Sequence, residues 1–487
     1  MWAEWSPRAF ARTDAEKKPV LLSLVTAWSD ECASMDATTY ADSRVESLID
    51  ERFVAVRVDA DRRPDINERY NLGGWPSTVF LTPAGDVLSG GTYFEAERLI
   101  GALGDVADAY RDRADEIHAR ATAMRNAVRS VRLQPDNRFQ PDDQLQRFSD
   151  LIGHFRSVLI GRFDAAHGGF GGVPKLPHPH ALMFALSLAG DGDAELAHLA
   201  IDTLNQIRLL WDPAAGGFYR YSDNADWTQP GTGKTLEDNA ALLHVYVEAA
   251  HRLPGAEWLE EAAAIVRWVR GTMADETEGG FFNAVSSKAI DRTMYVDRNA
   301  MMAGAFIRAA ALFDDIWLRD LALKALEAVV VPTYMPGDGV GHVAERNRGH
   351  GVRGLLTDNI HAASALIWAH AATGHLPYSM LAAEVIQFAI RTMWDESAAG
   401  FRDRVAADDP VVPFELNCHA ACVLDRIGVL TGDAAYQERA RRILDSLAPA
   451  FRQHDLFGAP YAVALREISD RRPPAGLELS PVDWQIG

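Results

Sequence analysis

Cysteine is scarce in this chain of 487 residues: there are three, an odd number that cannot form a framework of paired disulfides. Long apolar runs are also missing, since none reaches the roughly 18 residues that a membrane helix needs. Basic residues are outnumbered, with 48 Lys and Arg against 68 Asp and Glu, which gives a net charge of −20. These shortages predict a protein of a reducing compartment, which we place in the cytoplasm, and make nucleic acid and membrane surfaces poor partners.

The remaining composition is that of a folded protein. Apolar residues make up 48% and aromatic residues 9% of the chain, which is enough to build large cores and excludes disorder as the main state. At about 150 residues per domain, the length corresponds to roughly three domains.

The first hundred residues alternate between apolar runs and helical patterns. Residues 19–25 and 53–59 are expected to form buried strands, with a helix over residues 30–52 between them. Two further strands follow Pro76 and are separated by a hairpin turn over residues 84–86. This order predicts an α/β thioredoxin-like domain, in which Pro76 is the cis-proline that faces the active-site turn.

Three motifs in this part carry a specific resemblance. They are Gly73-Gly74-Trp75-Pro76, Phe80-Leu81-Thr82-Pro83 and Gly90-Gly91-Thr92-Tyr93-Phe94. With them, the chain resembles the spermatogenesis-associated protein 20-like family over nearly its whole length. The resemblance implies a thioredoxin-like domain followed by an all-helical toroid.

The redox motif of that family is incomplete here. Met35 aligns the family's Cys-His-Trp-Cys with residues 29–32, so that Ser29 replaces the first cysteine and Cys32 remains. A dithiol–disulfide cycle needs two sulfur atoms that can bond at about 2 Å. We therefore expect a redox-inactive domain with a degenerate motif of Ser29, Cys32 and Pro76, serving as a lid or as a docking site for a protein partner. A remaining thiol-dependent or chaperone-like role of Cys32 is the alternative.

Six copies of a glycine-rich turn repeat between residues 140 and 470. One glycine from each copy lies at positions 169, 217, 280, 339, 400 and 458. Asparagines recur after four of the turns, at 239, 299, 359 and 417, each near the start of an apolar helical pattern. About twelve helices in six hairpins predict an all-α (α/α)6 toroid with the more apolar helices inside, and an open α-solenoid is the alternative. The toroid resembles those of N-acylglucosamine 2-epimerases and six-hairpin glycosidases. The expected domains are residues 1–115 (thioredoxin-like), 116–141 (helical linker) and 142–487 (toroid).

Polar residues at the starts of the inner helices are the candidate site, because equivalent positions in a closed toroid share one mouth. Sugar chemistry there needs two acid/base groups on opposite sides of one bond or carbon atom. The predicted catalytic residues are Asp238, Asp358 and His178. The predicted substrate-binding residues are His180, Lys234, Glu237, Asn239, Asp297, Arg298, Asn299, Asn359 and His419, and His361 belongs to the same polar ring.

Two observations weaken this assignment. An asparagine or aspartate in the first helical turn is commonly a cap or clamp. The family's His and Glu also correspond to Gly231 and Gly233 here, so that the pocket has a different ligand or has lost a reaction.

No metal or cofactor is predicted. Cys418, His419 and Cys422 place two thiols on one helical face, but there is no second cysteine pair to complete a zinc site. His342, Glu345 and His350 lie in a Gly/Arg-rich loop that we expect to cover the mouth of the toroid.

Three functional hypotheses remain. In the first, the toroid binds a neutral or amino sugar-like molecule and isomerises or hydrolyses it. In the second, the protein is a non-catalytic binding or scaffold protein. The third is the thiol-dependent role of Cys32.

Overall fold

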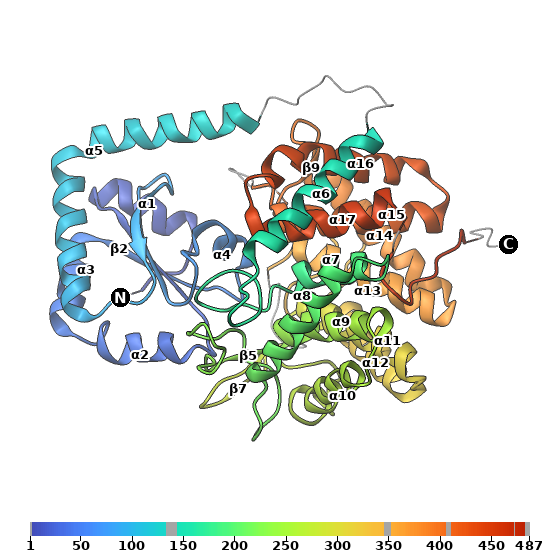
Figure 1. Cartoon of the computed structure of the whole chain (residues 1–487). Coiled ribbons are helices and arrows are strands. Elements are labelled where there is room, and N and C mark those ends of the chain that lie inside the picture. Colours follow the sequence, from blue (N-terminus) through green and yellow to red (C-terminus); the bar gives the residue numbers. More distant parts are fainter. Residues whose placement is uncertain (1, 133–143, 345–351, 406–410, 472, 483–487) are drawn as a thin grey trace. The chain divides into compact units, whose positions relative to one another are not determined.

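The computed structural model describes residues 2–132, 144–344, 352–405, 411–471 and 473–482 (Figure 1). The chain divides into two compact units, which are Met1–Pro135 with Ser286–Ala289, and Asp136–Val285 with Ile290–Gly487. Residues 133–141 of the expected linker lie outside the described residues, as do Glu345 and His350. No helix of the described part is long and apolar enough to cross a membrane.

A four-stranded sheet in the order β2-β1-β3-β4 forms the centre of the first unit. β1 (Val20–Val25) is parallel to β2 (Val54–Asp59) and antiparallel to β3 (Ser77–Leu81), which pairs with β4 (Val87–Gly91). These are the strands that the sequence predicts, and the Trp75–Pro76 peptide is cis as expected. The thioredoxin-like architecture is confirmed.

Alternation along the strands gives the sheet two apolar faces. On one face, Leu22 and Val56 pack with residues of α1 (Pro7–Glu16) and α4 (Pro64–Tyr70). On the other face, Leu21 and Ala55 pack with residues of α2 (Asp30–Thr38), α3 (Ser43–Arg52) and α5 (Ala96–Arg132). Side chains of successive residues in a strand point to opposite faces, so one short strand serves both cores.

The prediction of a single helix over residues 30–52 is wrong, because the structure has two helices there, α2 and α3. The carboxylate of Asp42 accepts the backbone N–H of Arg44 at 2.8 Å and so caps the start of α3. An apolar pattern that continues across the break hides this new helix start.

Ser29 and Cys32 lie at the start of α2. Ser29 is the N-cap, and its Oγ accepts the backbone N–H of Cys32 at 3.1 Å. The Cys32 side chain is 3% exposed, and burial raises the pKa of its thiol. Because the thiolate is the nucleophile in disulfide exchange, burial lowers the reactivity of Cys32.

We expect the protein not to reduce insulin disulfides with dithiothreitol above background, because Ser29 cannot attack a disulfide. The Ser29→Cys variant should form a dithiol couple with Cys32, measurable by titration in glutathione redox buffers. Turnover by the wild-type protein at the rate of a dithiol thioredoxin would contradict this.

The second unit is a closed ring of helices. Its described residues form twelve α-helices, α6–α17. The inner helices are α7 (Pro179–Ala189), α9 (Leu236–Arg252), α11 (Val296–Phe313), α13 (Leu356–Thr373), α15 (Phe414–Thr431) and α17 (Ala459–Ser469). Each inner helix contacts the next, and α17 contacts α7, which closes the ring.

The outer helices complete six hairpins. They are α6 (Gln144–Arg162), α8 (Ala194–Ile207), α10 (Glu257–Trp268), α12 (Ile316–Thr333), α14 (Leu376–Met393) and α16 (Ala434–Phe451). The (α/α)6 toroid predicted from the repeat is confirmed, and the open solenoid is excluded by the contact of α17 with α7.

The glycine-rich turns are held by a buried lysine in the first two hairpins. Asp212 accepts the backbone N–H groups of Ala214 and Ala215, and Lys234 Nζ contacts Asp212 Oδ2 at 2.8 Å. Lys175 contacts Asp164 at 2.7 Å in the same way one hairpin earlier. Glycine is required at position 217, where φ is +80° and a Cβ atom would lie 2.5 Å from the Trp268 ring.

Four buried asparagines join the turns to the inner helices. The Oδ1 atoms of Asn239, Asn299, Asn359 and Asn417 accept a turn N–H at 2.6–3.3 Å. Their Nδ2 atoms donate to the carbonyl four residues earlier, at 2.7–2.9 Å. All four side chains are fully buried. The structure therefore places Asn239, Asn299 and Asn359 in this clamp rather than against a ligand, because the backbone occupies their polar atoms.

Replacing Asn239 by Ala should lower the free energy of unfolding by about 1–3 kcal/mol, because the N–H of Phe218 loses its acceptor inside the protein. Chemical denaturation measures this change. Asn205→Ala, an exposed asparagine of α8, is the matched control and should stay within about 0.5 kcal/mol of wild type. Equal stability of Asn239→Ala and wild type would contradict the clamp.

Candidate functional site

The starts of α9, α11 and α13 bring acidic residues to one end of the ring. The asparagine clamps fix the first turn of each helix, and Asp238, Asp297 and Asp358 lie one or two residues before a clamp. The order of the helices around the ring then puts these acids on neighbouring helices.

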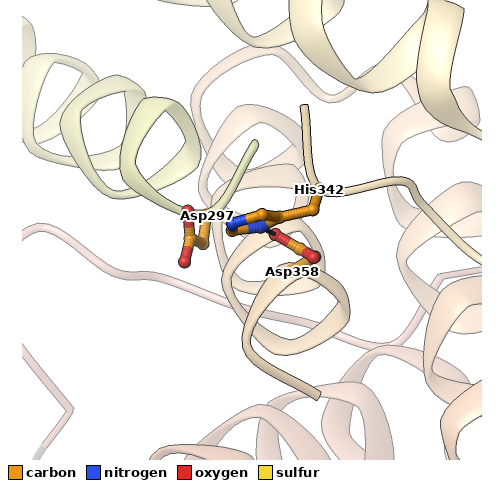
Figure 2. Close-up of side chains that lie close together, drawn as sticks. All are labelled: Asp297, His342 and Asp358. Carbon is orange, nitrogen blue, oxygen red and sulfur yellow. Dashed lines mark hydrogen bonds and ion pairs between the residues drawn. The ribbon is translucent and has the colours of Figure 1, made fainter. Parts of the chain in front are cut away.

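Asp297, His342 and Asp358 form a buried cluster. Figure 2 shows the His342 ring between the two carboxylates, with a hydrogen bond of 2.8 Å between its Nδ1 atom and Asp358 Oδ1. The three side chains are buried, with relative exposures of 8%, 1% and 0% in sequence order. Burial raises the pKa of Asp358 to about 6, although His342 opposes the shift. Burial also acts to raise the pKa of Asp297, but the charges of His342 and Arg298 outweigh it and lower that pKa.

Glu237 and Arg298 lie beside this cluster. Arg298 Nε is 3.4 Å from Glu237 Oε2, and its guanidinium also donates to Asn283 Oδ1. The Glu237 side chain is 53% exposed, yet burial by the surrounding protein raises its pKa to about 7.

Three histidines come from separate inner helices to the same end. The rings of His361 on α13 and His419 on α15 have centroids 4.7 Å apart. His180 on α7 lies 3.8 Å from Glu415 of α15. Burial lowers the pKa of His361, and it lowers that of His419 well below the usual value, with help from His361 and His180. His361 and His419 are therefore neutral at pH 7 and can accept or return a proton.

Two ion pairs lie further inside the ring. Arg308 Nη2 contacts Glu248 at 2.5 Å and its Nη1 donates to His244 Nδ1 at 3.0 Å. Arg426 makes two contacts with Glu467, at 2.7 and 2.9 Å. Since arginine only donates, His244 Nδ1 is an acceptor, and burial together with Arg308 lowers the pKa of His244 far below its usual value.

Two of the predicted site residues lie elsewhere. Lys234 is 4% exposed and holds its own turn through Asp212. The His178 ring packs on Phe457, with centroids 5.9 Å apart, and burial lowers the pKa of His178 to about 4. No contact joins His178 to Asp238 or Asp358 among the described residues. Asp238 pairs with Arg220 at 2.8 Å, beside Glu237.

Several residues of this end were not predicted. His244 and Arg220 carry no spacing signal, because His244 lies inside α9 and Arg220 lies in a loop. Glu415 lies two residues before Asn417, as Glu237 and Asp297 do before their asparagines, so the repeat could have indicated it. His342 was placed in a covering loop, whereas its side chain is buried against Asp358. Cys418 and Cys422 are buried free thiols and take no part in this cluster.

Residues 1–129 match the family model Thioredox_DsbH, described as "Protein of unknown function, DUF255". Human spermatogenesis-associated protein 20 is 30% identical over 304 residues, which are 58% of this chain and 38% of the human protein. The chain resembles spermatogenesis-associated protein 20. The rat protein of that name is 28% identical over the same 58% of this chain. The matched part spans less than half of these relatives.

Solved structures resemble the second unit in fold. Cellobiose 2-epimerase from Spirochaeta thermophila has a TM-score of 0.56 at 14% identity, covering 69% of this chain and 99% of that one. A D-mannose isomerase has a TM-score of 0.55 at 14% identity, covering 64% and 88%. At these identities the likeness shows the fold, and the resemblance to epimerase toroids predicted from the sequence is confirmed at that level.

Glu237→Gln should change how stability depends on pH. With a folded pKa near 7 and an unfolded value near 4.5, the folded protein keeps a proton that the unfolded chain releases, so ionisation destabilises it as pH rises through this interval. The melting temperature of wild type minus that of Glu237→Gln should therefore fall between pH 4.5 and 7 and level off above.

Glu260→Gln, the same charge change at an exposed position of α10, serves as the control, and its curve is subtracted to remove the effect of net charge. A corrected difference that rises with pH would show that Glu237 is stabilised as a carboxylate.

Proposed function

We propose that the helical ring binds a neutral sugar-like molecule at the starts of its inner helices and moves a proton at one of its carbon atoms. The observation that carries the proposal is the convergence of His180, His361 and His419 from three inner helices. Two of these histidines have a pKa lowered by burial, which keeps them neutral at pH 7.

Neutral imidazoles suit proton transfer at a carbon next to a carbonyl group. One imidazole takes the proton from that carbon and, as the imidazolium so formed, returns it to the other face of the same carbon or to the neighbouring carbon. In the second case the other, neutral imidazole passes the hydroxyl proton from one oxygen to the other, so that both imidazoles end neutral. The products are an epimer or an isomer of the sugar, and the step needs no oxidant or reductant. His361 and His419 are the proposed acid/base pair, with His180 and Glu237 as binding groups.

The arginines of this end favour a ligand without a negative charge. Arg220, Arg298, Arg308 and Arg426 are each paired with a carboxylate, namely Asp238, Glu237, Glu248 and Glu467. A phosphorylated or uronic-acid ligand would have to displace one of these carboxylates. The similar folds of cellobiose 2-epimerase and D-mannose isomerase also support a sugar with an open carbonyl form.

Hydrolysis of a glycosidic bond is the second candidate, favoured by one observation. Glu237 has a pKa raised to about 7, which suits a general acid. A glycosidase also needs a second carboxylate across the bond, and Asp238 and Asp297 are the nearest candidates.

The first unit completes the proposal as a redox-inactive module that docks a protein partner. Ser29 supplies a helix cap where a redox thioredoxin has its attacking cysteine, which supports this role. We keep the proposed division into residues 1–115, a helical linker over 116–141 and a toroid over 142–487.

Proton exchange in D2O tests the proposed chemistry. The full chain is incubated with glucose, mannose, fructose, cellobiose and N-acetylglucosamine, and proton NMR follows both deuterium entry at carbon 2 and new sugars. We expect exchange with at least one sugar, and a loss of about 100-fold or more in His361→Asn or His419→Asn.

His198→Asn, an exposed histidine of α8, is the matched control and should keep the exchange rate. If a sugar binds but takes up no deuterium, the ring is a binding site without proton-transfer activity. Release of monosaccharide from cellobiose would favour hydrolysis of a glycosidic bond. Neither binding nor exchange with any of these sugars would contradict the proposal.

A further inference from the structure

The proton transfer proposed above does not involve the cluster of Asp297, His342 and Asp358. Its members come from the first turn of α11, the segment after the turn at Gly339, and the first turn of α13. Each aspartate offers a carboxylate oxygen and His342 offers a ring nitrogen. These three atoms all lie within 4.8 Å of one another.

One oxygen of the cluster has no partner. Asp358 is fully buried, and its Oδ2 atom makes no hydrogen bond with the described residues, although Oδ1 contacts His342 at 2.8 Å. A buried carboxylate oxygen without a partner is costly, so buried charges are normally paired or bound to a metal.

The surrounding contacts hold the donors in place. Asp297 accepts the N–H of Arg298 at 2.8 Å and the hydroxyl of Thr357 at 3.1 Å. The backbone of His342 is held on both sides, by Val352 O and by the N–H of Val296, at 2.9 Å each. Its ring packs on Tyr295, with centroids 5.0 Å apart. Such second contacts orient metal ligands in known sites.

We propose that Asp297, His342 and Asp358 bind one divalent transition-metal ion, for which Zn²⁺ and Mn²⁺ are the probes. Imidazole and carboxylate together suit these ions better than Ca²⁺ or Mg²⁺, which prefer oxygen ligands alone. Ligand bonds of about 2.0–2.2 Å require the three donor atoms to approach one another by small side-chain rotations. The ion neutralises the two buried carboxylates and gives Asp358 Oδ2 a partner.

Three protein ligands leave coordination positions for water or for a ligand hydroxyl. Asp297, the least buried of the three, lies beside Arg298 and Glu237 at the end of the ring. The metal site uses none of the ligand atoms of His361 or His419, although Asp297 interacts electrostatically with His361, and neither proposal depends on the other. The sequence predicted no metal, so the proposed metal site departs from that prediction.

Isothermal titration of the chelator-treated full chain tests the site. We expect one Mn²⁺ or Zn²⁺ ion per chain, a higher melting temperature in its presence, and visible absorption bands when Co²⁺ is the probe. Asp358→Asn and His342→Gln should weaken binding by more than the roughly 10–100-fold that a second contact contributes. Mn²⁺ separates this site from the thiols of Cys418 and Cys422, which favour soft ions.

Asp238→Asn removes the same charge at the same end of the ring, outside the cluster, and should bind the ion as wild type does. Circular dichroism confirms that each variant is folded. If the wild-type protein binds neither Zn²⁺ nor Mn²⁺ stoichiometrically, the cluster is only an ion pair and the proposal is overturned. Unchanged metal binding by folded Asp358→Asn would overturn it as well.

Discussion

The hydrogen bonds between four buried asparagines and the turns before their helices determine the geometry of the ring. Each asparagine joins a turn N–H to a carbonyl in the first helical turn, so that turn and helix cannot slide past each other. Repeated at intervals of 58–60 residues, this contact aligns the starts of neighbouring inner helices. The acids before the clamps, and His361 and His419 two residues after them, are placed by this alignment.

The chemistry of the ring follows from burial of polar groups at those helix starts. Burial keeps His361 and His419 neutral and Glu237 easily protonated, while the arginines are paired with carboxylates. This end of the ring presents carboxylates and neutral imidazoles, while its arginines are paired with carboxylates. Such an environment favours an uncharged polar ligand. In the cluster of Asp297, His342 and Asp358, two buried carboxylates share one imidazole, and the proposed metal ion would neutralise their negative charge.

Much of the fold could be predicted from residue patterns. Apolar strands and the cis Pro76 indicated the thioredoxin-like sheet, and the turn and asparagine repeats indicated the toroid, because both patterns are local and periodic. The break between α2 and α3 was missed because only the cap of Asp42 marks it. Lys234 and His178 were misplaced, since spacing shows a residue's place along a helix but not whether its own turn binds its side chain. His342 and His244 required the coordinates, because their partners are distant in sequence.

Long-range proton–nitrogen NMR of the imidazoles measures whether His361 and His419 are neutral and contact a sugar, with His361→Asn and His419→Asn used to assign the signals. We expect both rings to be neutral at pH 7 and their nitrogen signals to shift when a saturating neutral sugar is added. Rings that are charged at pH 7, or signals that no neutral sugar moves, would contradict this expectation.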